Sequence, residues 1–240
     1  MSGLRGIRSW AALVLGCAAV LAGTERAAAE TIALIGTGNV GSALGRRFAE
    51  QGHTVVYGSR DPAAADVTAL VRETGHGATA LPPAQAAALS RIVVLAVPWS
   101  AAEDVVRGLG DLSGKIVVDP TNPRVTATDG FADYPPPPDS NAERIARLAR
   151  GAEVVKAFST LGAETMLDPR LAEGPVTIPI VGDDRAAKEV VAKLAREIGL
   201  EGVDVGPLRH ARIIEGLHYL RANALGGRVN FHFRRDTARD

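Results

Sequence analysis

Cysteine is almost absent from the 240-residue sequence: the single thiol belongs to Cys17, in the N-terminal segment that precedes the predicted fold. Residues 30–240 therefore lack the side chain that thiol catalysis, disulfide bonds and cysteine-ligated metal sites require. His210 and His218 share the last predicted helix, but no close Asp or His set completes a metal site around them. We expect no bound metal.

A dominant sign of charge and a long apolar run are also missing. The 27 basic and 27 acidic residues give a formal net charge of zero, so no electrostatic argument favours nucleic acid or an anionic surface as a partner. No stretch after residue 30 has the length and unbroken apolarity of a membrane span. Hydrophobic residues make up 46% of the chain, which is enough for one sizeable core.

Residues 1–29 have the three-part order of a secretory signal peptide. A basic start, an apolar run over residues 10–23 and Ala27-Ala28-Ala29 as a cleavage site follow one another. We therefore expect cleavage near Ala29 and a periplasmic or secreted protein. The alternatives are an uncleaved anchor, lipidation at Cys17, and a cytoplasmic protein whose start codon is misassigned.

Apolar runs alternate with amphipathic segments along residues 30–240. The run at 31–35 is nearly continuous, as in a central strand buried on both faces, and apolar residues recur at helical spacing after it. This alternation predicts one α/β domain, a doubly wound parallel sheet with a small C-terminal extension. The expected strands cover residues 31–35, 53–57, 78–81, 91–97, 115–118, 153–158, 176–181 and 202–205.

Two segments depart from this alternation. The irregular stretch 119–140 contains four consecutive prolines at 135–138, typical of a stiff surface loop. Near the C-terminus Val229, Phe231 and Phe233 alternate with polar residues, as in an edge strand or a dimer contact. A homodimer is therefore one expected assembly.

The motif Gly36-Thr37-Gly38-Asn39-Val40-Gly41 follows the first predicted strand and opens the first predicted helix. That context makes G-x-G-x-x-G specific for a dinucleotide. Gly36 permits the tight turn, Gly38 lets the backbone approach the pyrophosphate, and Gly41 lets the helix pack close to the strand. The helix N-terminus supplies free N–H groups and a favourable dipole for the phosphates.

The end of the second predicted strand indicates which dinucleotide binds. An NAD site usually has Asp or Glu there for the ribose hydroxyls, whereas this chain has Gly58-Ser59-Arg60. The missing carboxylate removes repulsion against a 2′-phosphate, and arginine beside a hydroxyl supplies charge-assisted hydrogen bonds to it. The sequence therefore favours NADP. In the alternative, Arg60 faces solvent and Asp61 binds the ribose, although a helix cap before Pro62 explains Asp61 better.

Further segments follow the glycine turn in a recognisable order. They are Tyr57-Gly58-Ser59-Arg60, Ala96-Val97-Pro98-Trp99, Val117-Val118-Asp119-Pro120-Thr121-Asn122-Pro123, Val155-Lys156-Ala157-Phe158-Ser159-Thr160-Leu161-Gly162 and Val181-Gly182-Asp183-Asp184. Over essentially all of residues 31–240, the chain resembles the NADPH-dependent reductases of the 8-hydroxy-5-deazaflavin coenzyme F420. The NADPH-binding domain of membrane metalloreductases and the N-terminal domain of pyrroline-5-carboxylate reductases look similar.

The resemblance implies hydride transfer between NADPH and a small-molecule acceptor, either the deazaflavin or a flavin-like ring. Such a transfer needs no metal and no obligatory acid or base, so no catalytic side chain is expected. Carried over by position, the resemblance implies four groups of binding residues: Thr37, Gly38, Asn39 and Val40 at the pyrophosphate, Ser59 and Arg60 at the 2′-phosphate, Val97 and Pro98 beside the nicotinamide, and Ser159, Thr160 and Leu161 along the shared cleft.

Two positions depart from the family pattern. Ser159 stands where related bacterial chains usually have Asn and archaeal reductases have His. Ala63-Ala64-Ala65 stands where family members often carry a basic residue, which leaves phosphate binding more dependent on Arg60. Two other functions stay open: a metalloreductase-like domain that reduces ferric or cupric ions through a bound flavin, and a non-catalytic NADPH-binding module.

Overall fold

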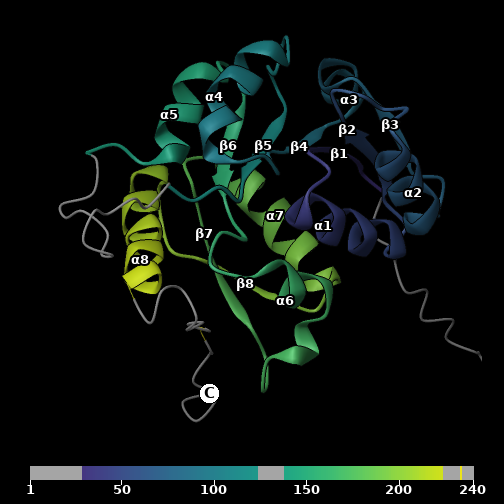
Figure 1. The fold of residues 1–240 in the computed structure, drawn as a ribbon. Helices are drawn as coiled ribbons and strands as arrows, with labels where there is room; N and C mark the ends of the chain where they lie inside the picture. The colour runs from purple at the N-terminus through teal and green to yellow at the C-terminus, as the bar shows by residue number, and fades with distance from the viewer. Residues whose placement is uncertain (1–28, 124–137, 224–232, 234–240) are drawn as a thin grey trace, which may run out of the picture.

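The computed structural model describes residues 29–123, 138–223 and 233, so residues 1–28 of the leader and Pro135–Pro137 of the four-proline run lie outside the described residues. One eight-stranded sheet, in the order β3-β2-β1-β4-β5-β6-β7-β8, forms the centre of the protein (Figure 1). Its strands are β1 Thr31–Ile35, β2 Thr54–Gly58, β3 Thr79–Leu81, β4 Ile92–Val94, β5 Ile116–Asp119, β6 Glu153–Lys156, β7 Thr177–Gly182 and β8 Glu201–Asp204. The α-helices are α1 Asn39–Glu50, α2 Ala65–Thr74, α3 Pro83–Leu89, α4 Trp99–Gly108, α5 Asn141–Leu148, α6 Ala163–Leu167, α7 Arg185–Glu197 and α8 Ala211–Asn223.

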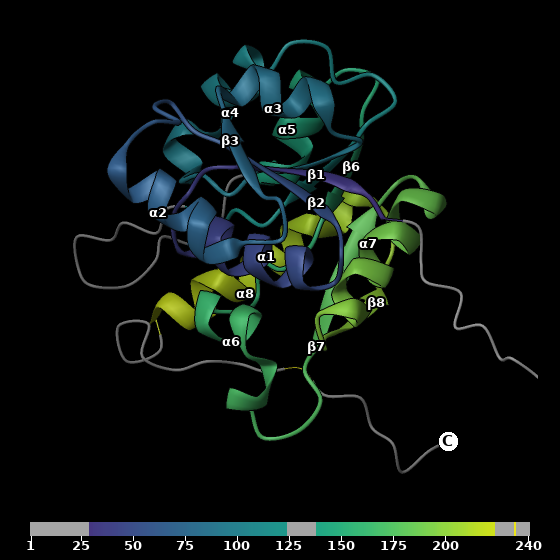
Figure 2. The same cartoon turned by 90° about the vertical axis from the view of Figure 1, so that its right-hand side faces the viewer.

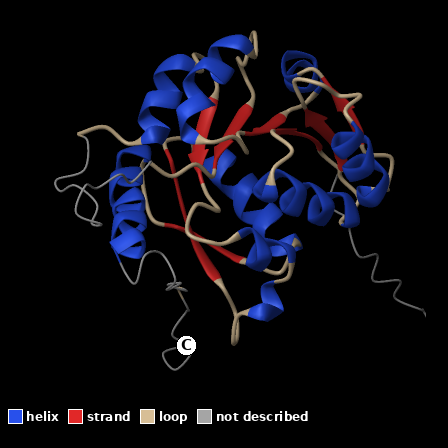
Figure 3. Ribbon diagram, viewed as in Figure 1, coloured by secondary structure: helices blue, strands red, loops and turns tan. Residues whose placement is uncertain are grey.

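Helices cover both faces of the sheet (Figures 2 and 3). The central strand β1 shows why both layers are needed, because successive side chains point to opposite faces. Ile32 and Leu34 are buried with Phe48 of α1 in one core, whereas Ala33 and Ile35 are buried with residues of α3 in the other. The predicted α/β class is confirmed, and the central strand is apolar and buried from Ile32 to Ile35.

The sheet is not parallel throughout. β7 runs antiparallel to β6 and pairs with it only through Val155↔Gly182 and Lys156↔Val181, after which β8 runs parallel to β7. Most of β7 therefore extends past the carboxyl end of β6 and forms the C-terminal extension together with β8. The predicted parallel arrangement holds from β3 to β6, and the antiparallel step lies at the start of the predicted C-terminal extension. Between β6 and β7 the chain forms only the five-residue α6 and a short 3-10 helix, instead of the long crossover helix that usually joins parallel strands.

The C-terminal tail touches the extension at one described residue. The N–H of Thr177, at the start of β7, donates to the carbonyl of Phe233 at 2.9 Å in an isolated antiparallel bridge. This contact agrees with the edge-strand interpretation of the alternating apolar residues. Val229 and Phe231 lie outside the described residues.

The last helix, α8, is fastened to α5 by a two-pronged ion pair. Nε and Nη2 of Arg212 donate to the Glu143 carboxylate at 2.7 and 2.6 Å. Glu143 also forms the capping box of α5 with Ser140, so the same carboxylate stabilises both helices. The Arg212 guanidinium, aided by hydrogen bonds from Ser140, lowers the pKa of Glu143 from 4.5 to about 2 against the opposing effect of burial.

This ion pair predicts an acid-sensitive attachment of α8. Because the folded-state pKa is depressed, the stabilisation is fully present above pH 4.5 and is lost as the pH falls through about 2. We expect Arg212→Gln to lower the free energy of unfolding at about pH 6 and to differ much less from the parent protein at about pH 2. Urea titrations followed by tryptophan fluorescence at both pH values measure this difference.

The matched control is Arg185→Gln, which removes an i,i+4 pair with Glu189 whose side chains are 88% and 64% exposed. Such pairs contribute little to stability, so the control should change little at either pH. A pH-independent effect of Arg212→Gln contradicts the assignment of the stabilisation to the Glu143 charge.

Candidate functional site

The glycine turn between β1 and α1 brings two backbone segments into direct contact. Gly36 has a φ of +113°, which L side chains rarely adopt, and a Cβ there would lie 2.3 Å from the carbonyl oxygen of Ala96. A Cβ on Gly41 would lie 2.1 Å from the carbonyl oxygen of Gly36. Only glycine fits at both positions because a Cβ would clash with the backbone. The two glycines therefore let α1 pack closely on β1 and on the chain after β4.

The middle glycine of the motif faces open space. Gly38 is the N-cap of the 12-residue α1, and no side chain there caps the helix by a hydrogen bond. A Cβ placed on Gly38 would have no atom within 4 Å. The N–H groups of the first helical turn therefore point at a space that is free to take an anion. This geometry fits a dinucleotide pyrophosphate.

A cavity of about 640 Å³ joins this turn to the ends of β2 and β4. It lies where the strand order reverses between β1 and β4, the place where open α/β sheets bind ligands. Its volume is in the range of small-molecule sites. The lining includes Gly36, Thr37, Gly38, Gly58, Ser59, Arg60, Pro83, Val97, Pro98, Ser100 and Asp104.

The structure therefore brings together predicted residues from three separate segments: the glycine turn, Ser59–Arg60 and Val97–Pro98. Asn39, Val40 and Gly41 begin α1 beside them. A larger hollow of about 1020 Å³ lies elsewhere, near the C-terminal ends of α1 and α7. It offers no helix N-terminus with free N–H groups, so volume alone does not identify the dinucleotide site.

The end of β2 is closely packed and lacks the carboxylate of an NAD site. A Cβ on Gly58 would already lie 2.7 Å from Cδ1 of Ile35. Arg60 is exposed at the cavity. The Asp61 carboxylate accepts the N–H of Ala63 at 3.1 Å. Asp61 therefore stabilises a turn, and its expected role as a helix cap is wrong because α2 starts only at Ala65.

Trp99 is held by protein contacts. The guanidinium of Arg144 lies 5.1 Å from the Trp99 ring centroid, as in a cation–π contact. The ring also packs against one of the two cores. These contacts account for the large side chain at the start of α4 without a stacked ligand.

Ser159, Thr160 and Leu161 follow β6 and are not among the residues that line the 640 Å³ cavity. Leu161 packs in the core. The Ser159 carbonyl accepts a hydrogen bond of 2.7 Å from the Asn122 amide. Oδ1 of Asn122 and Oγ1 of Thr160 are buried with no hydrogen-bond partner among the described residues. Roles in binding the second ring stay predictions for these three residues.

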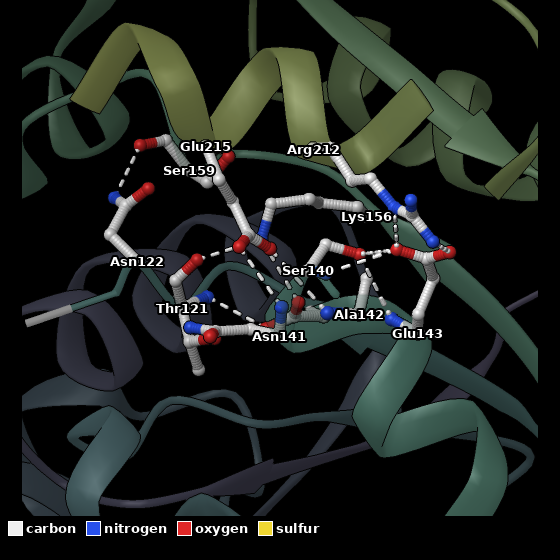
Figure 4. A network of polar contacts seen from close by, with 11 residues as sticks. Thr121, Asn122, Ser140, Asn141, Ala142, Glu143, Lys156, Ser159, Arg212 and Glu215 are labelled. Atoms are coloured by element: carbon white, nitrogen blue, oxygen red, sulfur yellow. Dashed lines mark hydrogen bonds and ion pairs between the residues drawn. The ribbon is translucent and has the colours of Figure 1, made fainter. Parts of the chain in front are cut away.

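A buried charge network lies under these loops and was missed by the sequence analysis (Figure 4). Lys156, fully buried in β6, pairs with Asp119 at 3.0 Å and with Glu215 of α8 at 2.9 Å. Burial alone would lower the pKa of Lys156, but the two carboxylates outweigh it and raise this pKa. Burial raises the pKa of Glu215 against the opposing effect of Lys156. The sequence does contain a sign of it: Asp119 and Lys156 each end an apolar run, and charged residues that are buried are almost always paired.

The described ranges contain neither a cluster of metal ligands nor a membrane-spanning helix. No group of three or more His, Asp or Glu side chains there is arranged to hold a metal ion. None of the helices in those ranges has both the length and the apolarity needed to span a bilayer.

Comparison with known proteins connects this geometry to a family. Residues 31–123 match the family described as NADP oxidoreductase coenzyme F420-dependent. The F420-dependent NADP reductase of Methanothermobacter thermautotrophicus is 34% identical, over 80% of this chain and 88% of that protein. The metalloreductase STEAP3 of Rattus norvegicus is 30% identical over 79% of this chain, but the match spans only 36% of that protein.

The fold comparison agrees with the sequence comparison. The crystal structure of a putative F420-dependent NADP reductase from Arthrobacter sp. FB24 superposes with a TM-score of 0.76 at 33% identity. The match covers 86% of this chain and all of that one, so it includes the β7–β8 extension and not the Rossmann core alone. The chain therefore belongs to the F420-dependent NADP reductase family and is an NADP-dependent oxidoreductase.

Proposed function

We propose that the protein transfers a hydride between NADPH and a deazaflavin, coenzyme F420, or a flavin-like acceptor. The observation that carries the proposal is the single cavity lined by the glycine turn, by Ser59 and Arg60, and by Val97 and Pro98. One cavity is therefore lined by groups that suit a pyrophosphate, a 2′-phosphate and an apolar ring. The family relationship supports the same reaction class.

Bound NADPH supplies two electrons and one hydrogen nucleus to the acceptor as a hydride. The chain contributes binding, orientation and exclusion of water. The N-terminus of α1 holds the phosphates, while Val97 and Pro98 present apolar surface at the carboxyl end of β4. Hydride transfer itself needs no proton transfer by a side chain.

The second ring is proposed to lie against the loops that follow β5 and β6. Asn122 and Ser159 join these loops. Oδ1 of Asn122 and Oγ1 of Thr160 are buried in this region and lack hydrogen-bond partners among the described residues. An acceptor with a hydrogen-bonding edge, as deazaflavins and flavins have, fits such a wall better than a bare metal ion does.

Anaerobic assays of residues 30–240 with NADPH test the proposal. Coenzyme F420, FMN and a ferric chelate are each offered alone, the chelate is also offered together with FMN, and NADPH oxidation is followed. Turnover with coenzyme F420 or with FMN alone supports the proposal. Turnover that requires a ferric chelate together with a flavin supports a metalloreductase-type activity instead, and no turnover with any of the three contradicts the proposal.

Arg60 should determine the preference for NADPH over NADH. Only NADPH carries the 2′-phosphate, and a charge-assisted hydrogen bond contributes roughly 1.5–3 kcal/mol. We expect Arg60→Ala to raise the Kd for NADPH by about tenfold or more while the Kd for NADH stays within about twofold. Calorimetric or tryptophan-fluorescence titrations measure both constants.

The matched control is Arg72→Ala, since Arg72 is exposed on α2 and does not line the cavity. This variant should leave both constants unchanged. Equal affinity of the parent protein for NADPH and NADH would falsify the assignment of Ser59 and Arg60 to the 2′-phosphate.

We also propose that the leader is removed near Ala29 on export. The residue after this position is already engaged in the fold, which supports the proposal. The Glu30 N–H donates to the buried His53 at 3.1 Å, and the Glu30 carboxylate accepts from Arg91 at 2.6 Å. A chain that begins at Glu30 therefore keeps all of its described contacts.

Expression of the full sequence in a bacterial host, followed by intact-mass measurement of the envelope fraction, tests this processing. We expect a chain that starts at Glu30, and Ala29→Phe should block cleavage because the cleavage site requires small residues. Recovery of the unprocessed chain in the cytoplasm alone contradicts both the cleavage and the periplasmic or secreted location.

A further inference from the structure

The ammonium of Lys156 has every donor in use. An ammonium has three N–H groups, and here they meet the Asp119 carboxylate at 3.0 Å, the Thr121 carbonyl at 2.8 Å and the Glu215 carboxylate at 2.9 Å. The Lys156 and Asp119 side chains are completely buried, and that of Glu215 is 6% exposed. One nitrogen thus joins β6, the chain after β5, and α8.

Two carboxylates meet this single ammonium, and the N-terminus of α5 compensates the excess negative charge. Glu215 accepts the backbone N–H groups of Asn141 at 2.9 Å and of Ala142 at 3.4 Å. These are the first two residues of α5, where free N–H groups and the helix dipole favour an anion. Figure 4 shows Glu215 between Lys156 and this helix start.

Stability alone does not explain such a network. Replacing a buried ion pair by apolar residues of similar volume is often neutral or stabilising. Hydrogen bonds, unlike apolar contacts, fix direction as well as distance. The informative question is therefore which segment the network orients.

The oriented segment is Thr121–Asn122. The Thr121 N–H donates to Asp119 at 2.8 Å, its carbonyl accepts from Lys156, and its hydroxyl accepts from Asn141 at 3.2 Å. All three polar groups of this residue are fixed. The next residue, Asn122, then donates to the Ser159 carbonyl at 2.7 Å.

We infer that Lys156, Asp119 and Glu215 are positioning residues for the acceptor. They hold Asn122 against the backbone of Ser159, and so they set the wall on which the second ring lies. This inference rests on the proposed function, because the wall has a role only if a second ring binds there.

The network should act on the acceptor and not on NADPH. Its members come from β5, β6, α5 and α8, and none of them lines the cavity formed at the ends of β1, β2 and β4. Loosening the network therefore leaves the phosphate-binding turn unchanged. A general loss of fold, in contrast, weakens both sites together.

Glu215→Gln is the sharpest variant. Glutamine keeps the shape of glutamate but has one acceptor oxygen and no charge. Its oxygen can still face Lys156 and Ala142, but its NH2 group then meets the N–H of Asn141, donor against donor, and the ammonium loses one of its two negative partners. We expect the KM for coenzyme F420 to rise by about tenfold or more and kcat to fall, with the Kd for NADPH within about twofold of the parent value.

Asn122→Ala tests the last link of the chain of contacts. It should raise the same KM while leaving the buried charges paired. If both variants act through one wall, the Glu215→Gln/Asn122→Ala double variant is no worse than the poorer single variant, because effects within one network are not additive. A stability effect alone does not produce this non-additivity.

Glu197→Gln is the matched control. Glu197 pairs with the buried His53 at 2.9 Å, where α7 ends and β2 is about to begin. This variant also disturbs a partly buried polar pair, but it should leave the KM for coenzyme F420 and hydrogen exchange in residues 157–161 unchanged.

Hydrogen exchange without any acceptor separates the network from the proposed function. We expect faster exchange in residues 119–122 and 157–161 of Glu215→Gln, and not of Glu197→Gln. If the parent protein reduces none of the acceptors, the proposed function fails and exchange alone still reports the positioning. Unchanged exchange in these segments, or equal weakening of NADPH and acceptor binding, overturns the inference.

Discussion

The burial of the Lys156 ammonium is the constraint that joins the two halves of the structure. The Rossmann half is held by apolar strands and would form without it. The extension has a weaker connection, because β7 meets β6 at only Val155↔Gly182 and Lys156↔Val181. Glu215 adds a charged contact from α8 to the same strand. Both the extension and α8 therefore meet the chain at the end of β6. Removing one partner of such a pair leaves an unpaired buried charge, which costs roughly 3–5 kcal/mol.

Different interactions hold the two ends of the proposed site in place. At the NADP end, the backbone determines the geometry: Gly36 and Gly41 fit because no side-chain atom could occupy their Cβ positions. This end needs no charged core, and its rigidity comes from close packing of α1 on the sheet. At the acceptor end, the loops after β5 and β6 are held by hydrogen bonds through Thr121 and Asn122. The proposed site therefore has one end held by backbone packing and one end held by a hydrogen-bond network.

Local patterns predicted most strands and helices in both halves of the structure, but not the direction of β7 or the Lys156 network. The first strand, the glycine turn and Ser59–Arg60 depend on neighbours in sequence, so period and motif were sufficient. The direction of β7 depends on how residues 157–176 pack, and five-residue α6 carries too few apolar positions to be recognised by period. The Lys156 network joins positions up to 74 residues apart, as the Asn141–Glu215 hydrogen bond illustrates. No local pattern contains such a contact, although charged residues within apolar runs mark where one must exist.

Ser159, which departs from the family pattern, lies in the half of the structure that hydrogen bonds hold. A serine side chain is too short to reach far into a cleft, but the contact that fixes this position uses the backbone carbonyl of Ser159 and the side chain of Asn122. The side chain at 159 is therefore free to differ from the family's asparagine or histidine without loosening the loop. Phe158, with a φ of +65°, sets the direction of the chain just before it, and such strained backbone persists only where its surroundings hold it in place. Here the Phe158 ring is buried and lies edge-on to the ring of Phe48, with 6.3 Å between centroids, so the core holds this backbone in place and the side chain of Ser159 is left available for specificity.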